Sequence, residues 1–249
     1  MGKIVAIGGG ENGRPGYAYE TGPFDKEILA LTDTQKPSFL FIGFAQEFSE
    51  GYYNVMKKIY NGMHGCETDY LTDDDILDAK TVESKLEKAA IIYVGGGSTL
   101  KLMTKLRKYK IDEMLRKAYA NNKVLCGVSA GAICWCDFGN SNSRKLTSES
   151  NQVIKVTGLG LIHVLMCPHF NADVNRQESM PKMMKSTYKI PAIALDNGAA
   201  LEINDNKYRI LISIEGAKAR KCYWKNGKYI INDMQVGIYQ SIQSLYTKD

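Results

Sequence analysis

One serine in this sequence is placed as a nucleophile would be. Residues 127–131 read Gly-Val-Ser-Ala-Gly, so that Ser129 has a glycine two positions away on either side. This segment follows a predicted strand at 123–126 and opens a predicted helix at 132–135, which puts Ser129 on a sharp turn. On such a turn the hydroxyl projects from the sheet, and the amide of Ala130 can face a developing oxyanion. These residues predict acyl-transfer chemistry at Ser129.

A serine hydroxyl requires a general base, and the sequence offers only three histidines. His64 follows a predicted helix and is followed by glycine, which favours a surface turn, and His163 lies inside the apolar run 161–165. His169 comes after the strand-like segment 164–167 and a proline, in a loop at a strand end, where catalytic groups are commonly mounted. We therefore expect His169 to be the base.

Two further glycine clusters follow predicted strands. Residues 95–97 are glycines that open a helix, and amides at a helix start bind anions, so these and the Ala130 amide can form an oxyanion hole. The alternative is that the glycines only relieve packing. Residues 8–13 match the dinucleotide-binding pattern G-x-G-x-x-G, but Pro15 and Gly16 interrupt the helix that should receive the pyrophosphate. We interpret 8–13 as a loop bordering the site and expect no cofactor.

Strands and helices alternate along most of the chain. Apolar, β-branched runs predict strands at 3–7, 38–42 and 90–94, and helical spacing of apolar residues predicts helices at 52–63, 81–88, 99–106 and 111–120. This order predicts an α/β protein with a doubly wound, mostly parallel sheet and helices on both faces. Sites in such folds lie at the carboxyl ends of strands.

The C-terminal quarter has a different character. Short strand candidates occur at 199–203, 208–213, 222–224 and 228–231, with an Asn-Gly hairpin signal at 226–227. We expect an antiparallel extension of the same sheet. Since no Pro/Gly/Ser-rich linker precedes it, residues 1–249 are expected to form a single domain.

Composition narrows the class of protein further. The 32 basic and 27 acidic residues are scattered, which argues against a nucleic-acid partner. No apolar stretch approaches the roughly 20 residues of a membrane span, and no export segment is evident, so we expect a cytoplasmic protein without a membrane partner. The six cysteines include no C-x-x-C pair, so no metal site is expected. A homodimer is the general expectation for oligomeric state.

The motifs around Ser129 and His169 resemble those of the peptidase E family of serine peptidases, a group that includes cyanophycinase and is similar in fold to class I glutamine amidotransferases. The matching segments are 93–99, 127–132 and 167–170, and the likeness extends from residue 3 to about residue 201. The resemblance implies Ser129 as nucleophile, His169 as general base and acid, and the amides of Gly97 and Ala130 as oxyanion hole. It also implies cleavage of short peptides after an N-terminal aspartate, without metal or cofactor.

The chain departs from the family in the residue that should orient the histidine. Where close relatives carry an aspartate shortly after the elbow helix, this chain has Asn142. An amide can hold the imidazole tautomer but stabilises the imidazolium less than a carboxylate does. Glu149 and Asp137 are the alternatives, and the sequence does not choose among the three.

Substrate recognition rests on fewer signals. An acidic first residue requires a cation, and Arg176, a few residues past His169, is the expected one. Asp196 ends a predicted strand and is the candidate for the substrate's α-ammonium group.

The sequence is also compatible with other functions. With Asn142 in the triad, the chain can be a weak or inactive homologue that binds a small molecule or serves a regulatory role. It can also be an esterase or amidase with the same nucleophile. The match at residues 8–13 leaves a dinucleotide-binding oxidoreductase as a further alternative.

Overall fold

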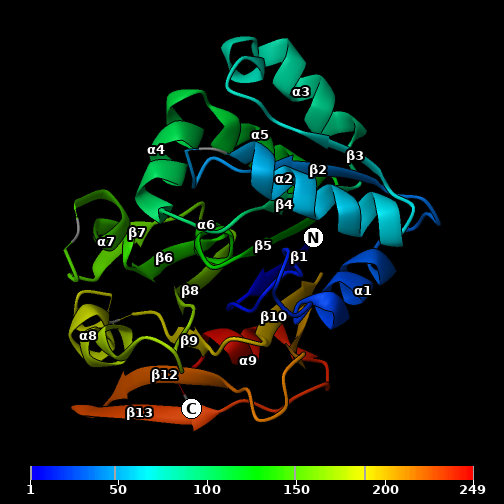
Figure 1. Cartoon of the computed structure of the whole chain (residues 1–249). Helices are drawn as coiled ribbons and strands as arrows, with labels where there is room; N and C mark the ends of the chain where they lie inside the picture. The colour runs from blue at the N-terminus through cyan, green and yellow to red at the C-terminus, as the bar shows by residue number, and fades with distance from the viewer. Residues whose placement is uncertain (1, 48, 149, 188, 249) are drawn as a thin grey trace.

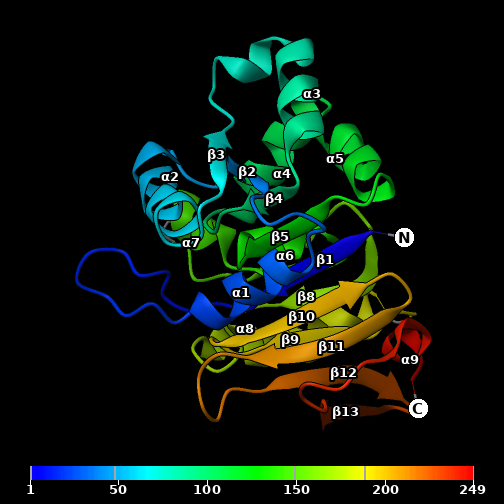
Figure 2. The ribbon, with the colours of Figure 1, turned by 90° about the vertical axis from the view of Figure 1, so that its right-hand side faces the viewer.

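The computed structural model describes residues 2–47, 49–148, 150–187 and 189–248, and within these ranges the strands form two sheets (Figures 1 and 2). The larger sheet has the spatial order β14 (Gln240–Ser241), β11 (Lys207–Ile212), β10 (Ala199–Asn204), β1 (Lys3–Ile7), β5 (Val124–Val128), β4 (Ile91–Val94), β2 (Ser38–Ile42) and β3 (Glu67–Tyr70). The smaller sheet has the order β13 (Lys228–Asp233), β12 (Ala219–Lys225), β9 (Ala192–Leu195), β8 (Ile162–Cys167), β6 (Cys136–Ser141) and β7 (Ile154–Thr157).

The centre of each sheet is parallel. In the larger sheet β1, β5, β4, β2 and β3 run in one direction, and in the smaller sheet β6, β8 and β9 do so. The antiparallel strands are β10, β11 and β14 at one edge of the larger sheet, and β7, β12 and β13 around the smaller one. In each sheet the carboxyl ends of the parallel strands therefore lie along one edge.

Helices connect these strands. They are α1 (Gly22–Ala30), α2 (Ser49–Lys57), the π-helix η1 (Lys58–Met63), the 3-10 helix η2 (Asp75–Leu77), α3 (Ala79–Lys88), α4 (Thr99–Lys108), α5 (Ile111–Ala120), α6 (Ala130–Cys134), α7 (Ser143–Ser148), α8 (Val174–Lys185) and α9 (Ile242–Tyr246). None of the helices in the described ranges combines the length and apolar character that a membrane crossing requires.

Both faces of the larger sheet are buried, as the alternation along β1 illustrates. Val5 and Ile7 pack with Phe24 and Ile28 of α1, whereas Ile4 belongs to the apolar cluster on the opposite face. Because successive side chains of a strand point to opposite faces, this strand, which is apolar from Ile4 to Ile7, needs cover on both sides. Figure 2 shows α2 on one side of the strands and α5 on the other.

The α/β class with a parallel core, flanking helices and antiparallel C-terminal strands is confirmed. The predicted extension differs in one respect, because its strands divide between the two sheets. β10 pairs with β1 in the larger sheet, whereas β12 pairs with β9 in the smaller one. The predicted hairpin at 226–227 joins β12 to β13, with Lys225 opposite Lys228.

Residues 140–143 are polar in sequence, yet Asn140 and Ser141 end strand β6 and are buried. Asn140 Nδ2 donates to Ser179 Oγ at 3.0 Å, and Ser141 Oγ lies 2.7 Å from Ser143 Oγ, whereas Asn140 Oδ1 has no hydrogen-bond partner among the described residues. Burial of Asn140 Nδ2 and Ser141 Oγ is tolerated because both atoms find partners, which a local sequence pattern does not reveal.

A buried carboxylate in α1 fixes the loop that follows β1. Asp25 accepts hydrogen bonds from the hydroxyls of Tyr60 at 2.6 Å and Tyr19 at 2.7 Å, and Tyr19 belongs to that loop. Burial raises the pKa of Asp25 from 3.8 to about 6, although the hydrogen bonds from both tyrosines oppose the rise. The folded protein therefore binds this proton more tightly than the unfolded chain does.

We predict that Asp25 makes the protein less stable as the pH rises from about 4 to 6. Because the folded pKa lies above the unfolded value, the stabilising contribution is complete at low pH and is lost above pH 6. The difference corresponds to about 3 kcal/mol of unfolding free energy. Urea unfolding of wild type and Asp25→Asn at pH 4, 5, 6 and 7 measures it. The comparison of the two proteins isolates the contribution of Asp25, so identical pH profiles would contradict the assignment.

Candidate active site

Ser129 occupies a strained turn between β5 and α6. Its backbone has φ 57° and ψ −105°, in a region that residues other than glycine rarely adopt. The Ser129 amide donates to the Ile7 carbonyl at 2.9 Å, which ties the turn to the end of β1. At Gly131 an added Cβ would lie 2.1 Å from the Val94 carbonyl oxygen, so the close approach of α6 to β4 requires glycine there.

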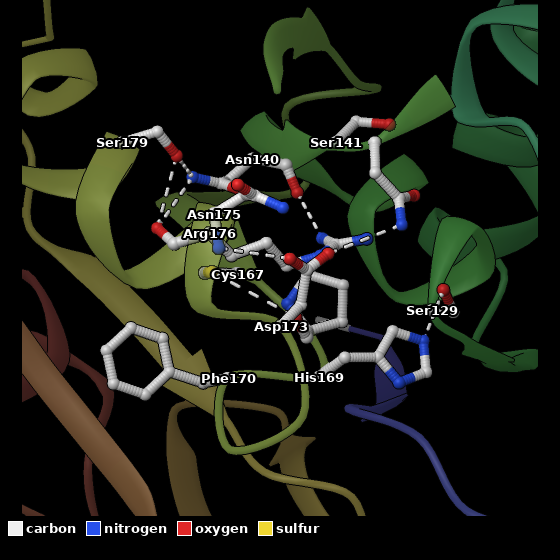
Figure 3. Close-up of polar contacts among 12 residues, drawn as sticks. Ser129, Asn140, Ser141, Cys167, His169, Phe170, Asp173, Asn175, Arg176 and Ser179 are labelled. Carbon is white, nitrogen blue, oxygen red and sulfur yellow. Dashed lines mark hydrogen bonds and ion pairs between the residues drawn. The ribbon is translucent and has the colours of Figure 1, made fainter. Parts of the chain in front are cut away.

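His169 lies in the loop between β8 and α8 and reaches Ser129 from the neighbouring sheet (Figure 3). The distance from His169 Nε2 to Ser129 Oγ is 2.8 Å. The His169 amide donates to the Gly8 carbonyl at 3.1 Å, and its φ of 54° is left-handed. The loop after β1 thus positions the imidazole through its backbone.

The other imidazole nitrogen contacts a residue that follows β9. Asn197 Oδ1 lies 2.6 Å from His169 Nδ1, and the Asn197 amide donates to Asn171 Oδ1 at 2.9 Å. With an acceptor oxygen at Nδ1, the ring proton belongs on Nδ1, and Nε2 is free to accept the serine proton. A Cβ at Gly9 would lie 2.1 Å from Asn197 Oδ1, so this pair packs directly on the glycine-rich loop.

The pKa of His169 is lowered from its ordinary value of 6.5. Burial is the largest cause, and the nearby Arg176 cation acts in the same direction, whereas the hydrogen bond to Asn197 and the charge of Asp173 oppose it. The imidazole is consequently neutral at neutral pH. A neutral ring is the form that accepts a proton from a hydroxyl.

Ser129 and His169 open into a cavity of about 410 Å³. Its lining also includes Gly96, Gly97 and Tyr52, together with residues of the loop after β1. Gly97 is among the residues that line the cavity, and Ala130 directly follows Ser129 at the start of α6. Backbone amides beside a nucleophile can bind an oxyanion.

The sequence model of Peptidase family S51 matches residues 4–211. The chain belongs to peptidase family S51. The resemblance to peptidase E that the sequence predicted is confirmed, because the chain matches the S51 family model and is similar to a protein named Peptidase E.

The names of two similar proteins agree with this assignment. The chain is 29% identical over 226 residues to "Uncharacterized peptidase YgaJ" of Bacillus subtilis, covering 88% of this chain and 91% of that protein. It is 24% identical over 199 residues to "Peptidase E" of a Nostoc species, covering 75% of this chain and 77% of the relative.

Solved structures share the fold. A crystal structure of a peptidase from an acI-B1 Actinobacterium superposes with a TM-score of 0.73 at 20% identity, over 97% of both chains. That of a putative peptidase E protein from Listeria monocytogenes gives 0.60 at 19% identity, over 85% of this chain and 98% of the other.

Contrary to the prediction from the sequence, neither Asn142 nor Asp137 contacts the imidazole of His169 in this S51 protein. Asn142 Nδ2 is 3.5 Å from Asp173 Oδ2 and does not contact His169. Asp137 faces His163, with Asp137 Oδ1 3.3 Å from Nδ1. Asp137 lies within β6 and Asn142 directly follows it, whereas the residue at His169 Nδ1 is Asn197, which follows β9. Glu149 lies outside the described residues.

The expected role of Arg176 is also corrected. The residue is 1% exposed, its guanidinium donates to the Asn140 carbonyl and to Asp173 Oδ2, and it does not line the cavity (Figure 3). It acts on the site at a distance, through the pKa of His169. A buried, engaged guanidinium cannot meet a substrate carboxylate without breaking this network.

Asp196 is likewise engaged. It accepts hydrogen bonds from Arg220 Nη1 at 2.7 Å and from the Lys218 amide at 3.0 Å, and it is absent from the cavity lining. Its neighbour Asn197 is the residue that the sequence analysis missed. The available signal was its place at the end of the predicted strand before Gly198, but no local sequence pattern marks an asparagine there as the partner of the histidine.

The dinucleotide interpretation of residues 8–13 loses its structural basis. The helix that should receive a pyrophosphate begins only at Gly22, after a loop whose residues line the cavity. No group of three or more His, Cys, Asp or Glu side chains within the described ranges is arranged to hold a metal ion.

Proposed function

We propose that this S51 protein is a serine-type peptidase that hydrolyses short peptides through an acyl-enzyme on Ser129, as a dipeptidase acting after an N-terminal aspartate. The observation that carries the proposal is the 2.8 Å contact between Ser129 Oγ and His169 Nε2 beside a cavity of about 410 Å³. Family membership supports peptide hydrolysis. The preference for aspartate rests on the likeness to peptidase E.

The chemistry follows from the positions of these groups. His169 Nε2 takes the hydroxyl proton as Ser129 Oγ attacks the peptide carbonyl, and the Gly97 and Ala130 amides stabilise the oxyanion. The imidazolium then protonates the leaving amine, and the peptide bond breaks to leave the acyl group on Ser129. His169 next takes a proton from the water that attacks the ester. It returns this proton to Ser129 Oγ as the bond between Ser129 and the acyl group breaks, and the acid is released.

A second candidate is a weak or inactive homologue that binds a small molecule. The observation in its favour is Asn197, since an amide beside Nδ1 stabilises the imidazolium less than a carboxylate does. A serine-directed fluorophosphonate separates the two functions. The proposal expects one adduct on Ser129, located by mass spectrometry of the digested protein, whereas an unlabelled serine would favour the second candidate.

The acid limb of activity is expected to have its midpoint below pH 6.5. Hydrolysis requires neutral His169, and its lowered pKa extends the neutral form to lower pH. Measurement of kcat/KM for aspartyl-leucine between pH 4.5 and 8.5 tests this. A midpoint above 6.5 would show that another group controls the reaction or that the imidazole environment differs.

A further inference from the structure

The cavity holds one pair of opposite charges, and both belong to the loop after β1. Glu11 and Arg14 are the residues with a carboxylate or guanidinium among the described residues that line it. The loop is a small hairpin, since the Glu11 carbonyl accepts the amides of Glu20 at 2.8 Å and Thr21 at 3.1 Å. The hydrogen bond from the Tyr19 hydroxyl to Asp25 also holds the end of this hairpin that is nearest to α1.

The two side chains currently neutralise each other. Arg14 Nε lies 2.9 Å from Glu11 Oε2, Arg14 Nη2 lies 3.0 Å from Glu11 Oε1, and the guanidinium stacks on Tyr17 at 3.9 Å from the ring centroid. The Arg14 side chain is 51% exposed and that of Glu11 is 36% exposed. An exposed pair of this kind contributes little to stability, so it separates at small cost.

The groups that the sequence suggested for substrate charges are unavailable. Arg176 and Asp196 are buried and engaged, and neither lines the cavity. A short peptide nevertheless brings an ammonium group and at least one carboxylate to the site. These charges lose part of their hydration when the peptide enters the cavity, so they require partners there.

We infer that Glu11 and Arg14 form a charge clamp that opens to bind the two charges of a short peptide, Glu11 accepting its α-ammonium group and Arg14 its carboxylate. This inference rests on the proposed function. Binding replaces one internal ion pair by two ion pairs to the substrate and leaves no charge of the clamp unpaired. The planar fork of arginine suits a carboxylate in particular.

The carboxylate has two possible sources, the side chain of an acidic first residue and the C-terminus of a dipeptide. Four substrates separate them: aspartyl-leucine, asparaginyl-leucine, aspartyl-leucine amide and N-acetyl-aspartyl-leucine. We expect Arg14→Gln to lower kcat/KM for aspartyl-leucine about 10-fold. If Arg14 binds the side-chain carboxylate, kcat/KM for asparaginyl-leucine should not change. If Arg14 binds the C-terminus, kcat/KM for aspartyl-leucine amide should not change. We expect Glu11→Gln to lower kcat/KM for the free amine and not for the acetylated peptide.

Lys218→Gln is the matched control. Lys218 is 53% exposed and pairs with Asp233 away from the cavity, so its loss removes the same charge at similar exposure. Arg14→Lys keeps the charge without the fork and should lose less than Arg14→Gln. Equal losses for all four peptides, or no loss, would overturn the clamp while the proposed function stands.

A binding measurement covers the case in which the wild type cleaves none of these peptides, which would count against the proposed function. Calorimetry of aspartyl-leucine with Ser129→Ala, alone and combined with Arg14→Gln or Glu11→Gln, then decides the clamp. A dissociation constant about 10-fold weaker in the combined variants supports it. Unchanged affinity, or no binding to Ser129→Ala, overturns it.

Discussion

Replacement of Ser129 by alanine is expected to lower kcat for aspartyl dipeptides by about 10⁵-fold or more. The substitution removes the attacking oxygen that lies 2.8 Å from His169 Nε2 and changes no backbone hydrogen bond of the turn. The residual rate should be that of a cavity that binds and polarises the substrate without an acyl-enzyme. Steady-state hydrolysis with product detection by chromatography measures the loss.

Ser213→Ala provides the control for this experiment. Within the described residues Ser213 Oγ has no hydrogen-bond partner, so its removal should leave both stability and turnover unchanged. Circular dichroism and the melting temperature should match wild type for both variants. Turnover of Asp-X dipeptides by Ser129→Ala within tenfold of wild type would refute the mechanism.

Substitution of Asn197 is expected to give the second-largest effect. In Asn197→Ala the imidazole loses its partner at Nδ1, so the productive tautomer and ring orientation are no longer enforced, and kcat should fall about 10²- to 10³-fold. In Asn197→Asp a carboxylate takes the same position. It should raise kcat, and it should shift the acid limb to higher pH, because a nearby negative charge raises the pKa of histidine.

The matched control for Asn197 is Asn142→Ala, which removes the same side chain from the position that the sequence favoured. Asn142 contacts Asp173 and not the imidazole, so its variant should retain most of the activity. The opposite order of effects, with Asn142→Ala severe and Asn197→Ala mild, would show that the histidine takes a different partner during the reaction. Single-turnover kinetics separate the effect on acylation from product release.

Local features of the chain were predictable because local physics governs them. Helix α5 occupies the predicted residues 111–120, since its amphipathic spacing is satisfied by any apolar surface on one side. The same holds for β1 at residues 3–7, where an apolar run demands burial. By contrast, β6 carries polar residues whose partners come from α7 and α8, and no nearby pattern announces them.

The sequence by itself determined the elbow around Ser129, the loop that carries His169 and the layered α/β class, because each depends on residues within a few positions. Only the tertiary structure decided which side chain meets His169 Nδ1. Strands β8 and β9 pair in parallel, so their carboxyl ends meet and bring Asn197 to His169 across 28 positions of sequence. The same packing buried Arg176 and left the charges of Glu11 and Arg14 in the cavity. Contacts between distant segments depend on the register of the sheets and the cover of their faces, which no short stretch of sequence contains.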